Sequence, residues 1–199
     1  MFIVAEMETM GFYISGHPLD EYSDRIKNLT PISDIKDRKF SEGKIIKFAG
    51  IIRSLRKHTT KKGDQMCFLS VEDRTDAIDV TVFSSAYYDS VSFIYPDSAV
   101  VIQGKIEFQS EEVVIRANNL WSAQNYEPDY YLTIPEELEN PETYAKLKTI
   151  LQQHRGQKMV FINKRGKWEK IKSNYWVSYS EQLSTEFNNL LGSNNVRRY

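Results

Sequence analysis

The sequence predicts a closed β-barrel of five short strands, preceded by a short helical segment and followed by a small α+β domain. Between Lys44 and Trp121 the apolar residues recur with a period of two, which is typical of strands. A helical stretch from Ser84 to Ile94 interrupts this pattern after the third strand. Three strands, a helix and two more strands is the order of an OB-fold barrel. An SH3-like barrel is the alternative architecture, but it would not place a full helix there.

The first strand of the barrel is expected over 45–55, with Gly50 at the point where a barrel strand needs a bend or bulge. A polar loop follows over 58–64. The second strand is expected over 66–73, and its residues alternate between two faces. One face holds Met66, Phe68 and Ser70, and the other holds Cys67, Leu69 and Val71.

The rest of the barrel follows from turn residues and apolar periodicity. Asp73–Asp76 predicts a tight turn, and the third strand is expected over 78–83. Ser84 is expected to cap the helix, whose inward residues would be Ala86, Tyr87, Val91 and Ile94. The fourth and fifth strands are expected over 99–108 and 112–120.

The two ends of the chain predict shorter elements. Helices are expected at Met7–Tyr13, which would end near Gly16, and at 19–29 after a turn at His17-Pro18. After the barrel, strands are expected over 130–134, 159–162, 168–171 and 175–177. One helix would begin at Asn140-Pro141 and end at Gly156, with Tyr144, Leu147, Ile150 and Leu151 as its apolar face. The last would begin at Ser180 and end at Gly192, with Leu183, Phe187, Leu190 and Leu191 inward.

Charge is segregated along a chain whose net charge is only -1. The stretch 36–62 holds ten basic residues and two acidic ones, whereas 127–142 holds six acidic residues and no basic one. This acidic stretch also carries Pro128, Pro135 and Pro141, so it predicts a domain boundary. We therefore expect a helical tail of a preceding domain over 1–33, a barrel over 34–125 and an α+β domain over 126–199.

The composition excludes several classes of protein. Its 199 residues include 12 Tyr, 10 Phe and 3 Trp, enough apolar area for a core. Mean hydropathy is -0.50, and no apolar run is long enough to span a membrane. Cys67 is the single cysteine, which excludes an intrachain disulfide and a cysteine-rich zinc site. The apolar residues 1–4 are too few for a signal peptide. We expect an intracellular, cytoplasmic protein.

Motifs for catalysis and for cofactors are missing from the sequence. It contains neither of the glycine-rich loops that hold nucleotide phosphates. His17, His58 and His154 are far apart, and the first and last have simpler structural roles at a turn and a helix end. A divalent ion among Glu72, Asp73, Asp76 and Asp79 is a weaker alternative, because alternation sends Glu72 and Asp73 to opposite faces. No metal or cofactor is expected.

Residues suited to binding nucleic acid are more numerous. OB barrels bind on their second and third strands and on the loops between strands 1 and 2 and strands 4 and 5. The first of these loops, taken as 53–63, is rich in basic residues that would contact phosphates: Arg53, Arg56, Lys57, Lys61 and Lys62. Phe68, Phe83 and Phe108 are candidates for base stacking, and Arg116 for a cation on strand 5. The alternatives are that these Phe residues belong to the core and that the loop is merely solvated.

Several segments resemble one known family. The segment 8–19 (ETMGFYISGHPL) is similar to the segment that precedes the OB domain in the α subunit of bacterial DNA polymerase III, a DnaE-type C-family replicative polymerase. The stretches 60–63 (TKKG), 68–75 (FLSVEDRT) and 78–83 (IDVTVF) resemble motifs inside that OB domain. Residues 178–180 and 190–196 resemble the end of the same subunit. The resemblance therefore covers nearly the whole chain.

This resemblance implies a non-catalytic part of a DNA-directed DNA polymerase, a nucleotidyltransferase whose catalytic carboxylates lie upstream. In the family, the OB domain contacts single-stranded template DNA, and the following domain binds the clamp-loader τ subunit in some bacteria. Carried over, Arg53, Arg56, Lys57, Lys61 and Lys62 would contact phosphates, and Phe68 or Phe83 would stack bases. The alternative is a protein-interaction module that docks τ or single-strand-binding protein and uses the barrel as a scaffold. A nuclease or tRNA-modifying enzyme with an OB appendage is the least favoured hypothesis.

Two departures from the family pattern stand out. Asp76 occupies a position where the family often has glycine, and Asp is expected to tolerate the left-handed conformation there. The turn 109–112 between strands 4 and 5 is short and acidic, which argues against DNA contact on that side.

Overall fold

The structure is a computed structural model that describes residues 16–199. The chain divides into two compact units, Met1–Tyr126 and Glu127–Tyr199, each with a hydrophobic core of its own. We call the described part of the first the barrel unit and the second the α+β unit. The expected helix at Met7–Tyr13 lies outside the described residues.

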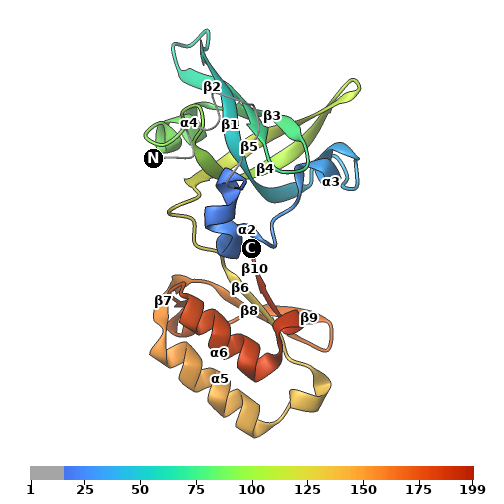
Figure 1. The fold of residues 1–199 in the computed structure, drawn as a ribbon, viewed down its shortest axis with the longest axis vertical. Coiled ribbons are helices and arrows are strands. Elements are labelled where there is room, and N and C mark those ends of the chain that lie inside the picture. Colours follow the sequence, from blue (N-terminus) through green and yellow to red (C-terminus); the bar gives the residue numbers. More distant parts are fainter. Residues whose placement is uncertain (1–15) are drawn as a thin grey trace. The chain divides into compact units, whose positions relative to one another are not determined.

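The barrel unit confirms the predicted fold. Its five strands are β1 (Ile45–Thr59), β2 (Gln65–Glu72), β3 (Ala77–Val82), β4 (Ala99–Gln109) and β5 (Glu112–Ser122). They close in the order β1-β2-β3-β5-β4, with β3 and β5 parallel (Figure 1). Helix α4 (Ser84–Ser90) lies between β3 and β4 in sequence, which is the OB-fold order and not that of an SH3-like barrel.

The long first strand closes the barrel because it pairs on both sides. Its first half pairs with β4, from Ile45 to Ile51, and its second half pairs with β2, from Ile51 to Thr59. Gly50 lies at the crossing, as the sequence predicts. A Cβ atom there would stand 2.4 Å from a methyl carbon of Val71 and 2.9 Å from the Glu72 carbonyl oxygen, so only glycine fits.

Strand β1 is four residues longer than the expected 45–55, which changes the setting of the basic residues. Its ladder with β2 continues to the pair Thr59 and Gln65, so the connecting turn is only Thr60–Asp64. Arg53, Arg56 and Lys57 therefore lie on a strand, and the expectation that they belong to a loop is wrong. We call residues 56–59 of β1 and the paired residues 65–68 of β2 the β1–β2 arm. The extension of β1 is not evident from the sequence because residues 56–59 show no alternation of apolar and polar residues.

Helix α4 differs from the expectation in two details. Phe83 is its N-cap residue and Ser84 its first helical residue, so Ser84 is not the cap. Ala86, Tyr87 and Ile94 are buried as expected, but Val91 is 46% exposed. Val91 follows the last helical residue, where the helical spacing that predicts an inward position has ended.

Short helices precede the barrel and pack onto it. They are η1 (Pro18–Tyr22), α2 (Ser23–Ile26) and α3 (Ile32–Lys36). The first two replace the helix expected over 19–29, with η1 beginning one residue earlier at Pro18, whereas the sequence analysis does not predict α3. Ile32 and Ile35 of α3 are fully buried in the same cluster as Phe48 and Ile102 of the barrel.

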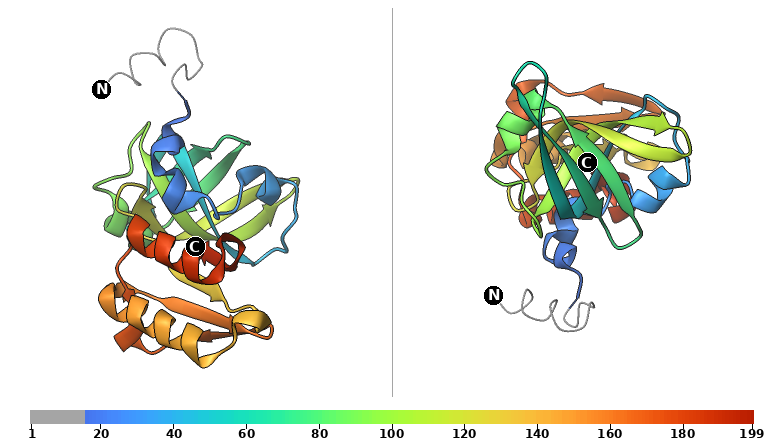
Figure 2. Two further views of the ribbon diagram at one scale, coloured as in Figure 1. Left: turned by 60° about the horizontal axis from the view of Figure 1, so that its bottom comes forward. Right: turned by 90° about the horizontal axis from the view of Figure 1, so that it is seen from above.

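The α+β unit is a four-stranded sheet with two longer helices. The sheet has the order β10-β6-β8-β9, with β6 and β8 parallel. Figures 1 and 2 show helices α5 and α6 on the same face of this sheet. The remaining elements are β7 and three 3-10 turns. The bounds are β6 (Tyr130–Thr133), η2 (Glu136–Leu138), α5 (Pro141–Gln153), β7 (Arg155–Lys158), β8 (Val160–Lys164), β9 (Lys167–Lys170), η3 (Ser173–Tyr175), α6 (Glu181–Leu191), η4 (Ser193–Asn195) and β10 (Val196–Arg198).

The helix ends of this unit are mostly as predicted. The Asn140 side chain accepts from the Thr143 amide, and the Ser180 side chain accepts from the Leu183 amide. Gly192 ends α6 with φ at 88°. Gly156, however, does not end α5. It lies in β7, where a Cβ atom would come within 2.3 Å of the Ser178 amide nitrogen. The expected strand over 175–177 is reduced to Val177, which forms antiparallel bridges with Arg155 and Lys158 of β7. Tyr175 instead ends η3, and Trp176 is the C-cap of that turn.

Candidate nucleic-acid interface

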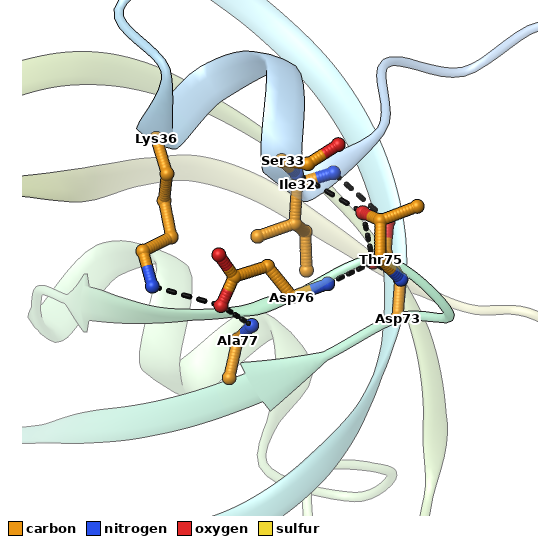
Figure 3. Close-up of polar contacts among 7 residues, drawn as sticks. All are labelled: Ile32, Ser33, Lys36, Asp73, Thr75, Asp76 and Ala77. Atoms are coloured by element: carbon orange, nitrogen blue, oxygen red, sulfur yellow. Dashed lines mark hydrogen bonds and ion pairs between the residues drawn. The ribbon is translucent and has the colours of Figure 1, made fainter.

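The turn between β2 and β3 holds helix α3 in place (Figure 3). Helix α3 begins after Pro31, whose side chain cannot cap the helix amides. Asp73 supplies the missing acceptor: its Oδ2 lies 2.9 Å from the Ile32 amide nitrogen. Thr75 Oγ1 accepts from the Ser33 amide at 3.0 Å. The turn is therefore a helix cap contributed from a distant part of the sequence.

The same turn is closed by its own side chains. Asp73 Oδ1 accepts from the amides of Thr75 and Asp76 at 2.7 and 3.0 Å. Asp76 Oδ1 accepts from Lys36 Nζ at 2.8 Å and from the Ala77 amide at 2.7 Å. The hydrogen bond from Lys36 holds the pKa of Asp76 below its usual range.

The expectation of a left-handed residue at position 76 is wrong. Among residues 16–199, the non-glycine residues with positive φ are Arg38, Asp97, Ser110 and Arg165. The turn accommodates Asp76 because its carboxylate accepts hydrogen bonds from Lys36 and from the Ala77 amide. The turn does not demand the conformation that glycine favours.

The second motif behind the family resemblance meets this turn. His17 Nδ1 accepts from the Leu19 amide at 3.1 Å, and Asp20 Oδ2 accepts from the His17 amide at 2.9 Å, which together cap η1. Asp20 also forms an ion pair with Arg74 of the β2–β3 turn. Burial, with a smaller contribution from Arg74, lowers the pKa of His17. Both motifs therefore have structural roles, and they are joined to each other.

The outer face of the barrel aligns four residues across four strands. Arg56 on β1 pairs with Phe68 on β2, Phe68 with Thr81 on β3, and Thr81 with Arg116 on β5. Side chains of directly paired residues point to the same side of a sheet. We call Arg56, Phe68, Thr81, Phe83 and Arg116 the outer-face row, because Phe83 follows Thr81 by two residues.

Cations and rings are paired within this row. The Arg56 guanidinium carbon lies 5.0 Å from the centre of the Phe68 ring, and that of Arg116 lies 4.8 Å from the Phe83 ring. Phe68 is half-buried and Phe83 is 40% exposed. The alternative that they are core residues is therefore wrong for both, whereas Phe108 does pack against the core.

A shallow groove of about 380 Å³ crosses this face. It lies between the β1–β2 arm and the β4–β5 turn. Its lining includes Ser54, Arg56, Phe68, Asp79, Thr81, Gln109 and Glu112. The groove is mixed in charge, because Asp79 and Glu112 face a cationic arm.

The other predicted residues lie elsewhere. Arg53 is the extra residue of a β-bulge and binds Glu72 with two hydrogen bonds of 3.1 and 3.0 Å. Lys57 pairs in register with the buried Cys67, which places it on the opposite face of the arm from Arg56. Lys61 and Lys62 are exposed in the turn between β1 and β2. Burial raises the pKa of the Cys67 thiol to about 11, so it stays protonated.

Some residues of this face lie outside the set predicted from the sequence. Thr81 lies between the inward residues Val80 and Val82, and strand alternation alone would place it outward. Lys105 pairs with Arg116 and extends the row to β4. Arg38 donates to the Glu111 carbonyl at 3.0 Å and covers the Phe108 ring, so a cation accompanies the acidic β4–β5 turn.

Neither a metal site nor a membrane-spanning helix is found in the described chain. Among residues 16–199, no three His, Cys, Asp or Glu side chains are grouped to hold a metal ion. Over the same residues, no helix has the length and apolar character needed to cross a bilayer.

Comparison with known proteins identifies the family. A family model described as an OB-fold nucleic acid binding domain matches residues 46–122. DNA polymerase III subunit alpha of Aquifex aeolicus is 32% identical over 75% of this chain and 13% of its own length. The same subunit of Halalkalibacterium halodurans is 26% identical over 96% of this chain and 18% of its own length.

Among solved structures, a replication protein A heterotrimer bound to single-stranded DNA is similar with a TM-score of 0.33 and 19% identity, covering 42% of this chain and 59% of that chain. The chain spans less than a fifth of the length of these two curated polymerase subunits. The chain is thus a homologue of the α subunit of bacterial DNA polymerase III, as its motifs predict, and it contains an OB-fold nucleic-acid-binding domain.

Proposed function

We propose that this chain is a non-catalytic part of a replicative DNA polymerase α subunit and binds single-stranded template DNA on the outer face of its barrel. The observation that carries the proposal is the outer-face row, in which two rings are each covered by an arginine. Stacking on aromatic rings combined with a cationic path for the backbone is the usual design of single-strand binding by OB folds.

The charges around the groove suggest how a strand would lie. Phosphates would contact three cations of the β1–β2 hairpin, namely Arg56, Lys61 and Lys62. Arg116 on β5 would provide a fourth cation on the opposite side of Phe68. Asp79 and Glu112 in the groove would repel phosphates, but carboxylates accept hydrogen bonds from base amino groups. A base in the groove would therefore stack on Phe68, and a neighbouring base outside the groove would stack on Phe83. Arg53 and Lys57 take no part in this arrangement.

The chemistry of the parent polymerase is assigned to segments outside this chain. We propose that the 199 residues carry no nucleotidyl-transfer centre, need no cofactor and act in the cytoplasm as part of a longer polymerase. Incubating the chain with primed DNA, deoxynucleotides and Mg²⁺ tests this directly. Primer extension would contradict the proposal.

Fluorescence anisotropy of a labelled single strand across a salt series tests the DNA face. Arg56→Ala is expected to weaken binding and to make the log-log salt slope shallower by about 0.7, the value of one phosphate contact on a single strand. Lys57→Ala is the matched control, because it removes a charge from the next residue on the opposite face. Equal effects of the two substitutions would contradict the outer-face assignment.

A second candidate function is the docking of a replisome protein by the α+β unit. A groove of about 360 Å³ in this unit has an apolar floor that includes Leu147, Leu151 and Ile162. Its rim carries Lys148, Lys164, Lys170 and Lys172 against a single acid, Glu169. This charge favours an acidic partner segment, and the family suggests the clamp-loader τ subunit, with single-strand-binding protein as the alternative.

Titration calorimetry with each purified partner tests this second function. Lys148→Glu combined with Lys164→Glu should abolish binding of the true partner and leave DNA binding by the barrel unchanged. If the double substitution left partner binding unchanged, the groove would be excluded as the binding site of that partner.

A further inference from the structure

The sheet of the α+β unit has one covered face and one face with an aromatic cluster. Tyr130, Leu132, Val160 and Ile162 are buried in the same cluster as Leu147 of α5 and Phe187 of α6. Residues next to them in sequence point to the other face, because successive side chains of a strand alternate. That face carries Tyr131 on β6, Phe161 on β8 and Trp168 on β9. Tyr199 follows β10 and joins the same cluster.

The rings of this cluster are in contact. Tyr131 and Phe161 stack with ring centres 4.5 Å apart and planes 10° from parallel. Trp168 and Tyr199 meet Tyr131 edge-on at 5.5 and 5.2 Å. Trp168 is 43% exposed, so its ring is open to a ligand. Tyr131, Phe161 and Tyr199 are half-buried, so Trp168 is the most exposed ring of the cluster.

Strand register adds a cation at one end of the aromatic row. Arg197 is exposed and pairs with Tyr131, which pairs with Phe161. Phe161 pairs with Lys170 at the other end, but the Lys170 ammonium lies 5.6 Å from the centre of the Trp176 ring, and Lys170 lines the groove beside α5. The neighbouring row adds Thr133, Asn163 and Trp168, which offer a hydroxyl, an amide and a second ring.

One acid, Asp129, acts on this row: burial raises the pKa of Tyr131, and the Asp129 carboxylate raises it further. Asp129 Oδ1 accepts from the Met159 amide at 3.0 Å, so it helps to join β6 and β8. The positions paired along the two rows hold no other carboxylate among the described residues. The face therefore has aromatic rings and positive charge, which suit a polyanion with stackable groups better than an acidic apolar peptide.

We propose that this sheet face binds single-stranded nucleic acid as a second site, separate from the barrel. Four-stranded sheets that present aromatic rings on an open face are a known platform for unpaired bases. Bases would stack on Trp168 and on the outer edge of the Tyr131–Phe161 pair, and Arg197 would contact a flanking phosphate. The proposal goes beyond the barrel function and does not depend on it.

The test uses the full chain with the barrel face weakened by Arg56→Ala and Phe68→Ala. Anisotropy with a labelled oligothymidine would measure the remaining affinity. Adding Trp168→Ala should lower it about five- to tenfold, as expected for loss of one stacked base, whereas Trp168→Phe should retain most of it. Arg197→Ala should weaken binding and reduce its salt dependence.

Lys167→Ala is the matched control for the lost charge. Lys167 lies next to Trp168 but pairs with Lys164, which contacts Tyr144 of α5 on the covered side. Ultraviolet crosslinking followed by peptide mapping should place thymine on the strands of 130–133 and 160–170. Unchanged affinity in Trp168→Ala and Arg197→Ala, with crosslinks only inside 45–122, would overturn the proposal and point to a protein as the occupant of this face.

The two DNA sites give separable results. If the barrel substitutions leave affinity intact and Trp168→Ala abolishes it, the sheet site is supported and the proposed barrel function is wrong. If the full chain binds no single strand at low salt, both are wrong.

Discussion

The β2–β3 turn and the outer-face row both include strands β2 and β3 but use their polar groups differently. In the turn, each carboxylate oxygen that contacts α3 has a donor: the Ile32 amide for Asp73 and the Lys36 ammonium for Asp76. On the outer face, by contrast, Arg56 and Arg116 rest over aromatic rings, with no carboxylate among their described contacts. The carboxylates of the turn thus have hydrogen-bond donors within the protein, whereas the arginines of the outer face are available for the phosphates of a ligand.

This contrast separates family signature from function. The most specific motifs, at 17–18 and 73–75, hold short helices onto the barrel. The residues best placed for DNA come from ordinary strand positions. A motif that identifies a family is thus not by itself the binding site of that family. The following predictions test this distinction, beginning with the largest expected effect.

Asp73→Ala should be the most destabilising change at the turn. It removes the acceptor for the Ile32 amide of α3 and for the Thr75 and Asp76 amides within the turn. Loss of a cap costs about 0.5–2 kcal/mol, and each further unsatisfied group adds about 1 kcal/mol. We expect a loss of about 2–4 kcal/mol in the free energy of unfolding, measured by urea denaturation.

The DNA affinity of folded Asp73→Ala should be unchanged under conditions where the variant remains native. Asp73→Asn is the matched control, because an amide oxygen retains part of the acceptor function. If Asp73→Ala instead weakened DNA affinity without changing stability, the β2–β3 turn would belong to the binding site. The proposed difference in role between the turn and the outer-face row would then be wrong.

Phe68→Ala and Phe108→Ala should have opposite phenotypes. Phe68 is on the outer face, so its loss should reduce single-strand affinity by about 1–3 kcal/mol and change stability little. Phe108 packs against the core, so its loss should lower stability and leave affinity nearly intact. Anisotropy and urea denaturation of both variants measure the two effects. Loss of affinity only in Phe108→Ala would move the interface to the β4–β5 side.

Arg53 and Arg56 provide a smaller comparison on one strand. Arg53→Ala removes the bidentate pair with Glu72 and should cost about 1 kcal/mol of stability, because both partners are partly exposed. Its affinity for DNA should stay within about twofold of the parent, since one remote surface charge contributes little at physiological salt. Thermal unfolding and anisotropy on the same samples would check this. A large loss of DNA affinity in Arg53→Ala would show that Arg53 belongs to the DNA interface and would contradict this prediction.

Part of the barrel is predictable from the sequence because buried residues alternate along β3 and most of β2. The inward set Cys67, Leu69 and Val71 and the mid-strand Gly50 follow from sterics that the sequence displays. Helix α3 is not predictable, since it has five residues and its cap comes from Asp73, far along the chain. The extended arm of β1 is equally hard to predict, because its residues are polar on both faces.

The candidate site is predictable only in composition. The sequence indicates basic and aromatic residues near the first two strands, but the face on which each lies depends on register. The bulge at Arg53 shifts that register by one residue, and Arg53 binds Glu72. Lys57 lies on the opposite face of β1 from Arg56, and a predicted loop cannot show this difference because a loop has no faces whereas a strand has two.

The smallest predicted effect concerns pH and His17. Neutral His17 accepts a hydrogen bond from the Leu19 amide through Nδ1, and a protonated ring cannot accept. The pKa of His17 is lowered in the folded protein, chiefly by burial, so the unfolded chain binds its proton more readily. The stabilising contribution is therefore present above about pH 6.5 and is lost as the pH falls through the lower, folded value.

Stability should thus decline by less than about 1 kcal/mol between about pH 7 and pH 5, within the range for loss of one exposed cap. Thermal unfolding measured across this range in the parent and in His17→Asn tests the assignment, because asparagine caps the same turn without titrating. A decline of equal size in both would mean that other groups cause it and that the motif at 17–18 does not sense pH. A flat profile only in His17→Asn would confirm that this signature residue serves the fold.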